Sequence, residues 1–395
     1  MEGDLHIGCS EKVLIVTDNN VETVGGEQES IKIIARNLSD ELGVAVLHPG
    51  ESKGDVGFCC IGVGTRTRIK ALLRRPVELA AYVVKLLRYL RGTEAKVVHT
   101  QAQASLFLIG FAIKLRLIPK RFTFVHTDRG TYSKYSAPVR ALFRVSLSVV
   151  DTLVTTTHRN RHLWEDALLG VRSGPEYAVI ENAVSNDGAE VPRQDGRRGE
   201  ITIGFAGRYC GWKNWPLALE IGRGVLADEA LKADVRMAIG CVDERDREAA
   251  ERFLSDARAV LGNALSAHVN VPHEEMAEFF RSIDILVMTS KPGTESFGRT
   301  AIEAMSEGCV VLSTDSGGPS EVLDDAGCIL AEPDEFLEKI KFYAMDVEAR
   351  VAKGRENQQR VQELYSADSN VAKHRALYEA AIARWRDVCS AGLKG

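Results

Sequence analysis

The sequence predicts an α/β protein made of two doubly wound, Rossmann-like domains that face a cleft. Its 395 residues exceed what one ordinary hydrophobic core organises. Short Val- and Ile-rich runs alternate with helix-length stretches, which is typical of parallel sheets covered by helices on both faces. The alternation stops at a polar stretch, residues 183–200, and then starts again.

The first half contains six expected strands and four expected helices. The strands are 12–17, 43–48, 96–99, 122–126, 151–157 and 177–181, and the helices are 27–42, 77–91, 101–115 and 138–150. We assign residues 1–185 to an N-terminal domain.

The second half repeats the pattern after the linker at 183–200. Its expected strands are 201–207, 235–240, 267–271, 284–289, 309–314 and 328–330, and residues from 333 onward are expected to be helical. We assign 186–368 to a second domain and 369–395 to a C-terminal helix. A Ser/Asp cap at 366–368 is expected to start this last helix.

Composition and charge describe a globular protein without an export signature. Hydrophobic residues make up 45% and charged residues 27% of the chain, and no run of about 18 apolar residues predicts a membrane span. The first twelve residues lack a signal-peptide pattern, and the eight cysteines form no metal or disulfide spacing. We therefore expect a cytoplasmic protein with reduced thiols.

The charge is distributed unevenly along the chain. The net charge is −5, yet residues 1–180 carry 24 Lys and Arg against 18 Asp and Glu, a balance of +6. The remaining residues carry 26 against 37, a balance of −11. The first half is therefore the half that would meet an anionic surface.

The stretch "GFAGRYCGWKN", 204–214, follows the first strand of the second domain. Arg208 and Lys213 lie in this strand–helix connection, where side chains and helix N-terminal amides can bind an anion. The spacing is neither that of a dinucleotide-binding GxGxxG nor that of a P-loop. A solvated loop with ordinary basic residues is the alternative.

The stretch "TESFGRTAIEA", 294–304, places Glu295 before a helix and Glu303 inside it. We expect "ESFG" to begin this helix, with the amides of 296–299 available to a phosphate. Glu303 would accept hydrogen bonds from two ribose hydroxyls, and Glu295 would face the group at the other end of a diphosphate. Acids that only cap a helix are the alternative.

Two loops of the first half are weaker candidates. "VGGEQES", 24–30, opens a helix with adjacent glycines, which permit close approach of a ligand or form an ordinary turn. "FTFVHTDRG", 122–130, puts His126 and Asp128 at the end of a strand, where a histidine is more often structural than functional.

These motifs together resemble the family-4 retaining glycosyltransferases of the GT-B fold. The resemblance rests on "GRYCGWKN", on "ESFGRTAIEAMSEGCVVLSTDSGGPSEVL" with its Glu-x7-Glu pair, and on "VGGEQES", "VHTD" and "VIENAVS" in the expected order. It is specific in 204–214 and 290–322. Ser296, Arg299 and Ala183 depart from the family's usual residues, and the first two bear on the choice of sugar.

The resemblance, which is weak across 50–120, implies that 1–185 binds the acceptor, that 186–368 binds the nucleotide sugar, and that 369–395 packs back on the first domain. It also implies roles for ten residues. Arg208, Lys213, Glu295 and His126 are the implied catalytic residues, and Gly26, Gly207, Phe297, Gly298, Arg299 and Glu303 are the implied donor-binding residues. The implied reaction is retaining transfer of a sugar from a nucleotide diphosphate to a glycan, glycolipid or other hydroxyl acceptor. No DxD motif occurs in the sequence, so we expect no metal and no cofactor beyond the co-substrate.

Three other functions stay open at this point. A nucleotide-sugar epimerase of the same fold would release the nucleotide without an acceptor. A two-domain ligand-binding protein would close on a small molecule without chemistry. An oxidoreductase is disfavoured because no GxGxxG follows a first strand.

Residues 66–92 form a basic stretch with eight Lys and Arg and one acid, Glu78. Pro76 should divide it into two helical pieces. Its large apolar residues and its cations fit a helix at the surface of an anionic membrane, on the inner face. A sheet-covering helix with a basic outer surface fits equally well. We expect no nucleic-acid partner, because no known binding module is present.

Overall fold

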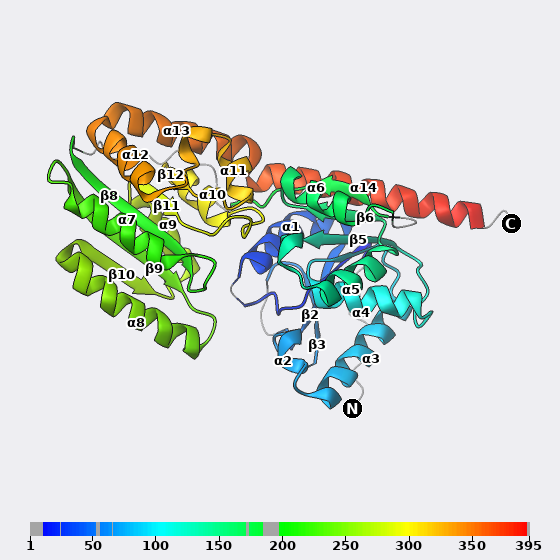
Figure 1. Ribbon diagram of the computed structural model, residues 1–395. Coiled ribbons are helices and arrows are strands. Elements are labelled where there is room, and N and C mark those ends of the chain that lie inside the picture. The colour runs from blue at the N-terminus through cyan, green and yellow to red at the C-terminus, as the bar shows by residue number, and fades with distance from the viewer. Residues whose placement is uncertain are drawn as a thin grey trace. The chain divides into compact units, whose positions relative to one another are not determined.

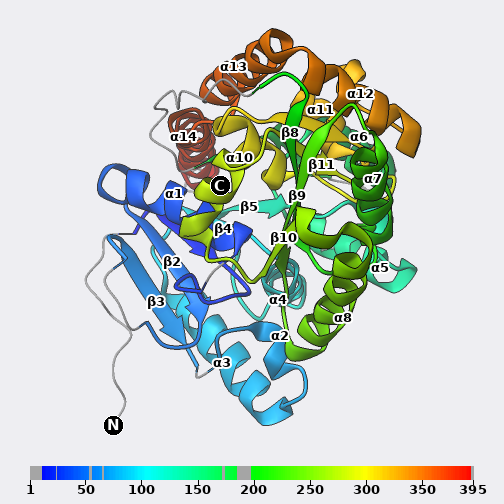
Figure 2. The ribbon, with the colours of Figure 1, turned by 90° about the vertical axis from the view of Figure 1, so that its left-hand side faces the viewer.

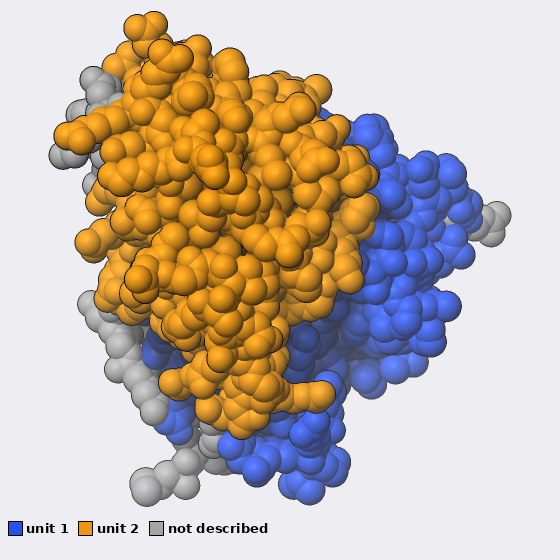
Figure 3. Space-filling view, turned by 60° about the vertical axis from the view of Figure 1, so that its left-hand side comes forward, with its two compact units in different colours: residues 1–182, 367–395 blue, residues 183–366 orange. Residues whose placement is uncertain are grey.

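A computed structural model describes residues 11–23, 25–52, 56–64, 66–170, 174–184 and 197–392, with side chains through residue 387. The chain divides into two compact units, shown in Figure 3. Unit 1 contains residues 1–182 and 367–395, and unit 2 contains residues 183–366. Most of the expected linker, at 185–196, and the first ten residues lie outside the described ranges. The functional names given to the domains stay predictions.

Unit 1 is built on a seven-stranded parallel sheet (Figures 1 and 2). Its strands are β1 (Val13–Val16), β2 (Val44–Pro49), β3 (Cys59–Val63), β4 (Val97–Thr100), β5 (Thr123–Asp128), β6 (Thr152–Thr155) and β7 (Glu176–Val179). Their order is β3-β2-β1-β4-β5-β6-β7. The order reverses once, between β1 and β4.

Seven α-helices of unit 1 cover the two faces of this sheet. They are α1 (Gly26–Leu42), α2 (Ile69–Leu72), α3 (Pro76–Gly92), α4 (Gln103–Lys114), α5 (Ala137–Leu147), α6 (His158–Ala167) and α14 (Ala367–Gly392). Helices α2 to α6 share one core with Leu14 and Val16 of β1. Val13 and Ile15 point to the opposite face, because successive strand residues alternate. Helices α1 and α14 pack against each other. Helix α1 also contacts β2, and α14 also contacts β4 and β5.

Unit 2 is built on a five-stranded parallel sheet with the order β10-β9-β8-β11-β12. The strands are β8 (Glu200–Arg208), β9 (Lys232–Gly240), β10 (Leu265–Val269), β11 (Ile285–Met288) and β12 (Val310–Ser313). The helices are α7 (Trp215–Ala227), α8 (Glu244–Leu261), α9 (Met276–Arg281), α10 (Arg299–Ser306), α11 (Gly318–Leu323), α12 (Pro333–Met345) and α13 (Val347–Leu364). One continuous apolar core fills the unit.

The predicted fold class is confirmed, and two predicted details are wrong. Strand β3 was not predicted, because its sequence CCIGV mixes cysteine and glycine with the apolar residues. Residues 328–330 were predicted as a strand, yet they form a 3-10 turn and one isolated bridge from Ile329 to Ser313. Pro76 separates α2 from α3, as predicted, and it is the first residue of α3.

The C-terminal helix returns to unit 1, as predicted. A 2.8 Å hydrogen bond joins the hydroxyl of Tyr378 on α14 to Nδ1 of His99 on β4. Trp385 donates to the carbonyl of Arg121 at 2.7 Å. Within the described ranges, no helix combines the length and hydropathy needed to cross a membrane.

Candidate active site

The candidate site lies at the carboxyl ends of β8 and β11, where the strand order of unit 2 reverses. Parallel α/β sheets bind ligands at such a point, because the connections on its two sides leave in opposite directions. The connection 209–214 follows β8, and the connection 289–298 follows β11. Both connections were selected from the sequence.

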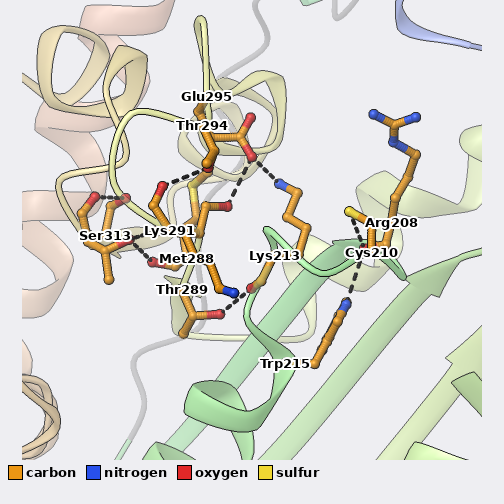
Figure 4. Close-up of polar contacts among 12 residues, drawn as sticks. Arg208, Cys210, Lys213, Trp215, Met288, Thr289, Lys291, Thr294, Glu295 and Ser313 are labelled. Atoms are coloured by element: carbon orange, nitrogen blue, oxygen red, sulfur yellow. Dashed lines mark hydrogen bonds and ion pairs between the residues drawn. The ribbon is translucent and has the colours of Figure 1, made fainter. Parts of the chain in front are cut away.

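Lys213 and Glu295 form an ion pair across this point. The Lys213 Nζ atom lies 2.9 Å from Oε1 of Glu295, and both side chains are largely buried (Figure 4). Ser290 donates its hydroxyl to the same oxygen at 2.9 Å. The two charged residues are 82 positions apart, and the neighbouring strands β8 and β11 bring them together.

Backbone hydrogen bonds join the two connections. The Thr289 hydroxyl donates to the carbonyl of Lys213 at 2.8 Å, and the amide of Lys291 donates to the carbonyl of Trp212 at 2.8 Å. These bonds fix the backbone on both sides of the ion pair. The Lys213 ammonium is therefore held in place by main-chain geometry as well as by Glu295.

Arg208 is the exposed cation of this site. Its guanidinium carbon lies 5.4 Å from the centre of the Trp212 ring, and it points away from Lys213 in Figure 4. Its carbonyl accepts a hydrogen bond from Trp215 at 3.1 Å. Gly207 leaves room for the lysine, because a Cβ at this position would lie 3.0 Å from Cε of Lys213.

The segment 295–298 is not helical, which corrects the prediction that "ESFG" begins a helix: Glu295 forms an isolated bridge with Gly317, and residues 296–297 form a bend. Helix α10 begins at Arg299, after Gly298 with φ 97°. Glu295 donates its amide to Ser316 and accepts at its carbonyl from the amide of Gly318, both at 2.9 Å. A Cβ on Gly318 would lie 2.4 Å from the nitrogen of Phe297, so only glycine permits this approach.

Phe297 anchors this non-helical segment in the core of unit 2. Its side chain is buried and meets the ring of Tyr365 edge to face at 5.6 Å. Arg299 donates from Nε to Oε1 of Glu303 at 3.3 Å, one turn along α10. The predicted ribose-binding carboxylate is therefore paired with the arginine that departs from the family pattern.

His126 belongs to unit 1, where it is fully buried on β5. Its Nδ1 atom lies 3.1 Å from the carbonyl of Thr100, which can only accept, so this nitrogen carries the proton. Nε2 is then an acceptor, and it has no partner among the described residues. Burial lowers the pKa of His126 to about 3, so the ring is neutral.

Asp128 lies two residues beyond His126 in a dense polar network. It accepts hydrogen bonds from Tyr135 and from the indole of Trp164, each at 2.9 Å. Burial raises the pKa of Asp128 to about 6. These contacts give Asp128 a structural role at the end of β5.

Gly26 is the first residue of α1, as the sequence predicted for an opening helix. The carboxylate of the next residue, Glu27, contacts the segment after β1. It accepts from the Thr17 hydroxyl and, at 3.1 Å, from the side chain of Asn19.

Sequence reasoning missed four residues of the unit 2 site: Trp212, Thr289, Ser290 and Ser316. The first three support Arg208, Lys213 and Glu295 as described above. The Ser316 hydroxyl is buried and has no partner among the described residues, and its carbonyl holds the Glu295 amide. Trp212 and Ser316 lie next to motifs that were recognised in the sequence, and this position was the one sign of their role at the site.

No group of three or more His, Cys, Asp and Glu side chains is arranged to hold a metal ion in the part of the chain that the structure describes. The polar groups of the unit 2 site are instead two cations, two carboxylates and backbone amides. This set suits an anionic ligand that also carries hydroxyl groups.

Comparison with known proteins gives matches in sequence and in structure. Residues 190–360 match the family described as "Glycosyl transferases group 1". The D-inositol 3-phosphate glycosyltransferase of Paenarthrobacter aurescens is 31% identical over 156 residues, which are 38% of this chain and 37% of that protein. The chain thus matches little more than a third of that relative's length.

Solved structures match over nearly the whole chain. Sucrose-phosphate synthase from Thermosynechococcus elongatus superposes with a TM-score of 0.76 at 14% identity, covering 95% of this chain and all of the other. Anabaena HepE, in complex with UDP and glucose, gives a TM-score of 0.72 at 15% identity and covers 94% of this chain and all of the other. At this identity the likeness concerns the fold.

Proposed function

Because the chain has the GT-B fold and its residues 190–360 match the group 1 glycosyl transferases, we propose that it transfers a sugar from a nucleotide diphosphate to a hydroxyl acceptor. The transfer retains the anomeric configuration. The acceptor is a glycan or a lipid-linked glycan, used in making a cell-surface polysaccharide or glycolipid. The protein works in the cytoplasm, at the inner face of a membrane.

The Lys213–Glu295 pair at the strand-order reversal is the observation that carries this proposal. When the bond from the sugar to the diphosphate breaks, negative charge accumulates on the leaving oxygen. A fixed ammonium next to that oxygen stabilises the transition state more than the ground state. Arg208, which is exposed and stacked on Trp212, supplies the second cation for the diphosphate.

Glu295 acts on the sugar in this proposal. Ser290 and Lys213 both contact its Oε1 atom and so fix the direction of the carboxylate. A fixed carboxylate selects sugars by accepting hydrogen bonds from their hydroxyls. It is not proposed as a nucleophile, because an ion-paired carboxylate is stabilised in its charged form and is less reactive.

The displacement occurs on the face of the sugar that the diphosphate leaves. The bond from the anomeric carbon to the phosphate oxygen breaks, and a bond from the acceptor oxygen forms on the same face. The acceptor proton passes to the departing phosphate oxygen. Atoms and charge balance without an enzyme-bound intermediate.

The nucleotide end of the donor is assigned to α10. Glu303 accepts the ribose hydroxyls, and Arg299 keeps its carboxylate in place. The backbone at Phe297 and Gly298 precedes α10, where free amides favour an anion.

Metal independence is part of the proposal. The two cations and the helix-terminal amides supply the charge that a divalent ion supplies in glycosyltransferases with a DxD motif. Transfer is therefore expected to continue in excess chelator. Loss of transfer on chelation, with recovery on adding a divalent ion, would contradict it.

The test begins with a screen of nucleotide sugars by thermal shift. Uridine nucleotides come first, because HepE was solved with UDP and glucose. Donors that stabilise the protein are incubated with glycan and lipid-linked acceptors, and products are read by mass spectrometry. An acceptor product heavier by one sugar residue is expected, with its anomeric configuration determined by NMR.

Two results would replace the proposal. Nucleotide release with an inverted free sugar and no acceptor product would indicate an epimerase. Tight donor binding with no product under any condition would indicate a ligand-binding protein. No stabilisation by any nucleotide sugar would remove all three functions.

A further inference from the structure

Unit 1 carries a continuous surface that is both basic and apolar. We call it the basic face and define it as residues 66–92, 114–121 and 137–147. These segments hold 14 Lys and Arg against a single acid, Glu78, although the chain as a whole has a net charge of −5. A solvent-facing surface normally mixes both signs, so this composition requires an explanation.

The three segments are neighbours in the fold. Arg91 of α3 donates to the carbonyl of Leu117 at 2.8 Å, which joins α3 to the loop after α4. Helices α4 and α5 pack closely, with the rings of Phe107 and Phe143 4.9 Å apart. Figures 1 and 2 show α3, α4 and α5 in a row on unit 1.

Helix α3 divides cleanly between a buried and an exposed side. Tyr82, Leu86 and Leu90 enter the core of unit 1. The opposite side exposes Val77 and Val84 in its first half and, besides Arg91, Lys85 and Arg88 in its second half. The exposed side contains no acid.

Exposed apolar side chains are concentrated on the same face. Seven of the twelve large hydrophobic residues that the described part of the chain exposes belong to it: Leu73, Val77, Val84, Leu115, Leu117, Leu142 and Val145. Val77 is 82% exposed and Leu115 67% exposed. Leu115 and Leu117 alternate with Lys114 and Arg116, all of them exposed.

The single acid of the face is neutralised locally. Arg66 donates to Glu78 at 3.1 Å, and Arg75 donates to its other oxygen at 2.8 Å. The remaining cations therefore set the electrostatic potential over the face. Lys120 pairs with Asp151 at 2.7 Å, and the other cations of the face are available to attract an anionic surface.

We propose that the basic face binds the surface of an anionic lipid bilayer. Lys and Arg at such a surface attract acidic headgroups, while protruding apolar side chains enter the boundary between headgroups and acyl chains. A soluble polyanion would use the cations and leave Val77, Val84 and Leu115 exposed. The combination of the two features selects the bilayer.

This surface extends the 66–92 helix considered from the sequence by two further segments. Binding itself does not depend on sugar transfer. If the proposed function holds, attachment of unit 1 places the enzyme where a lipid-linked acceptor resides. The basic face would then act by raising the local acceptor concentration, without contacting the reacting atoms.

The test measures binding of the full chain to vesicles by co-sedimentation. Vesicles of phosphatidylcholine with phosphatidylglycerol should bind the protein at low salt and release it as salt rises. Lys85→Gln with Arg88→Gln should weaken binding about 25-fold, at about fivefold for each basic residue lost. Val77→Ser with Leu115→Ser should weaken it on the order of tenfold.

Matched control variants come from α8 of unit 2. Arg245→Gln with Arg258→Gln removes the same charge from exposed positions, and Val242→Ser with Val260→Ser removes exposed valines. Both should change binding less than about twofold. Equal losses in these controls, or equal binding to pure phosphatidylcholine, would overturn the proposal.

Two further readouts separate the alternatives. Soluble polyglutamate that binds as tightly as vesicles, with no effect of the valine and leucine changes, would indicate an acidic polymer or protein instead. Transfer to a soluble acceptor is measured on the same variants and should be unchanged. Vesicle binding without any transfer would overturn the proposed function alone.

Discussion

The two sheets each reverse their strand order once, and the side chains at the two reversals differ in charge. In unit 1, between β1 and β4, the Asp18 carboxylate accepts from the amides of Ala104 and Ser105, both at 2.8 Å. Glu27 occupies the start of α1 nearby in sequence. In unit 2, between β8 and β11, Arg208 and Lys213 stand at the corresponding place.

This difference shows that the fold supplies the location and the side chains decide its use. A helix N-terminus attracts an anion, and unit 1 satisfies the N-terminus of α4 with the Asp18 carboxylate. Unit 2 offers cations and a non-helical segment before α10. The diphosphate of the donor is therefore assigned to unit 2, and four predictions test the contrast between the units, from the largest expected effect to the smallest.

Acidification should unfold unit 1 before unit 2. His99, His126 and His374 are fully buried in unit 1, and burial lowers the pKa of each, to about 3 for His126 and about 4 for His374. The unfolded chain takes up these protons near pH 6.5, so this contribution to stability is complete above that pH. It is lost as pH falls, down to about pH 4 for His374 and about pH 3 for His126. The loss amounts to roughly 3 kcal/mol for His374 and roughly 5 kcal/mol for His126.

Asp128 opposes this trend in part. Its raised pKa means that the folded state holds a proton between pH 6 and pH 3.8 that the unfolded chain releases, which stabilises unit 1 on acidification by roughly 3 kcal/mol. Hydrogen exchange of each unit at pH 7.5, 5.5 and 4.5 measures the balance. Among the described histidines, those of unit 2, His268 and His273, are not buried. Earlier exchange in unit 2 would refute the prediction.

Lys213→Ala should reduce turnover about 100- to 1,000-fold with little change in acceptor KM, because it removes a charge that acts on the leaving group. Steady-state kinetics with a soluble acceptor measure it. The control is Lys232→Ala, which breaks the 3.1 Å pair with Glu200 at the opposite end of β8 and leaves the site intact. A parallel loss in acceptor KM, or an equal loss in the control, would count against the role.

Asp18→Ala should destabilise the protein by about 1–3 kcal/mol, since two amides at the start of α4 lose their acceptor. Denaturant titration measures this loss, and the donor Kd should stay unchanged. Asp166→Ala, an exposed acid on α6, serves as the control for charge. A large change in donor Kd for Asp18→Ala would place the diphosphate in unit 1 and break the contrast.

Arg299→Leu should have the smallest effect, a change of about 0.5 kcal/mol in stability and about twofold in donor KM. It removes the partner of Glu303 while the carboxylate remains. The control is Arg247→Leu, which removes the same i,i+4 pairing with Glu251 on α8. If donor KM rises tenfold, Arg299 contacts the nucleotide directly.

The sequence was sufficient for most strands because buried parallel strands are short, continuous apolar runs. It failed for β3, where cysteine and glycine dilute the run, and for 328–330, where three apolar residues form only one bridge. The Arg299–Glu303 pair follows from helical spacing. The contact of Lys213 with Glu295 does not, because it depends on which strands are neighbours.

The supporting residues of the site were still harder to predict. Ser290 and Thr289 carry no motif, and their hydrogen bonds to Glu295 and Lys213 arise from the turn after β11. Gly318 was visible as part of a Gly-Gly pair. Its role is to let the backbone at Phe297 approach closely, and this contact between the two segments is visible only in the folded structure.

Unit 2 is an insertion within unit 1. The chain enters it after Asn182 and leaves it before Ala367, and its two ends are joined by the hydrogen bond from the Val184 amide to the carbonyl of Tyr365 at 3.0 Å. Residues 183–366 therefore begin and end at the same spot, so a fragment with these limits can be excised or its termini relocated without stretching the chain. Unit 1 is interrupted in the sequence, so an isolated unit 1 would need only a short linker between Asn182 and Ala367.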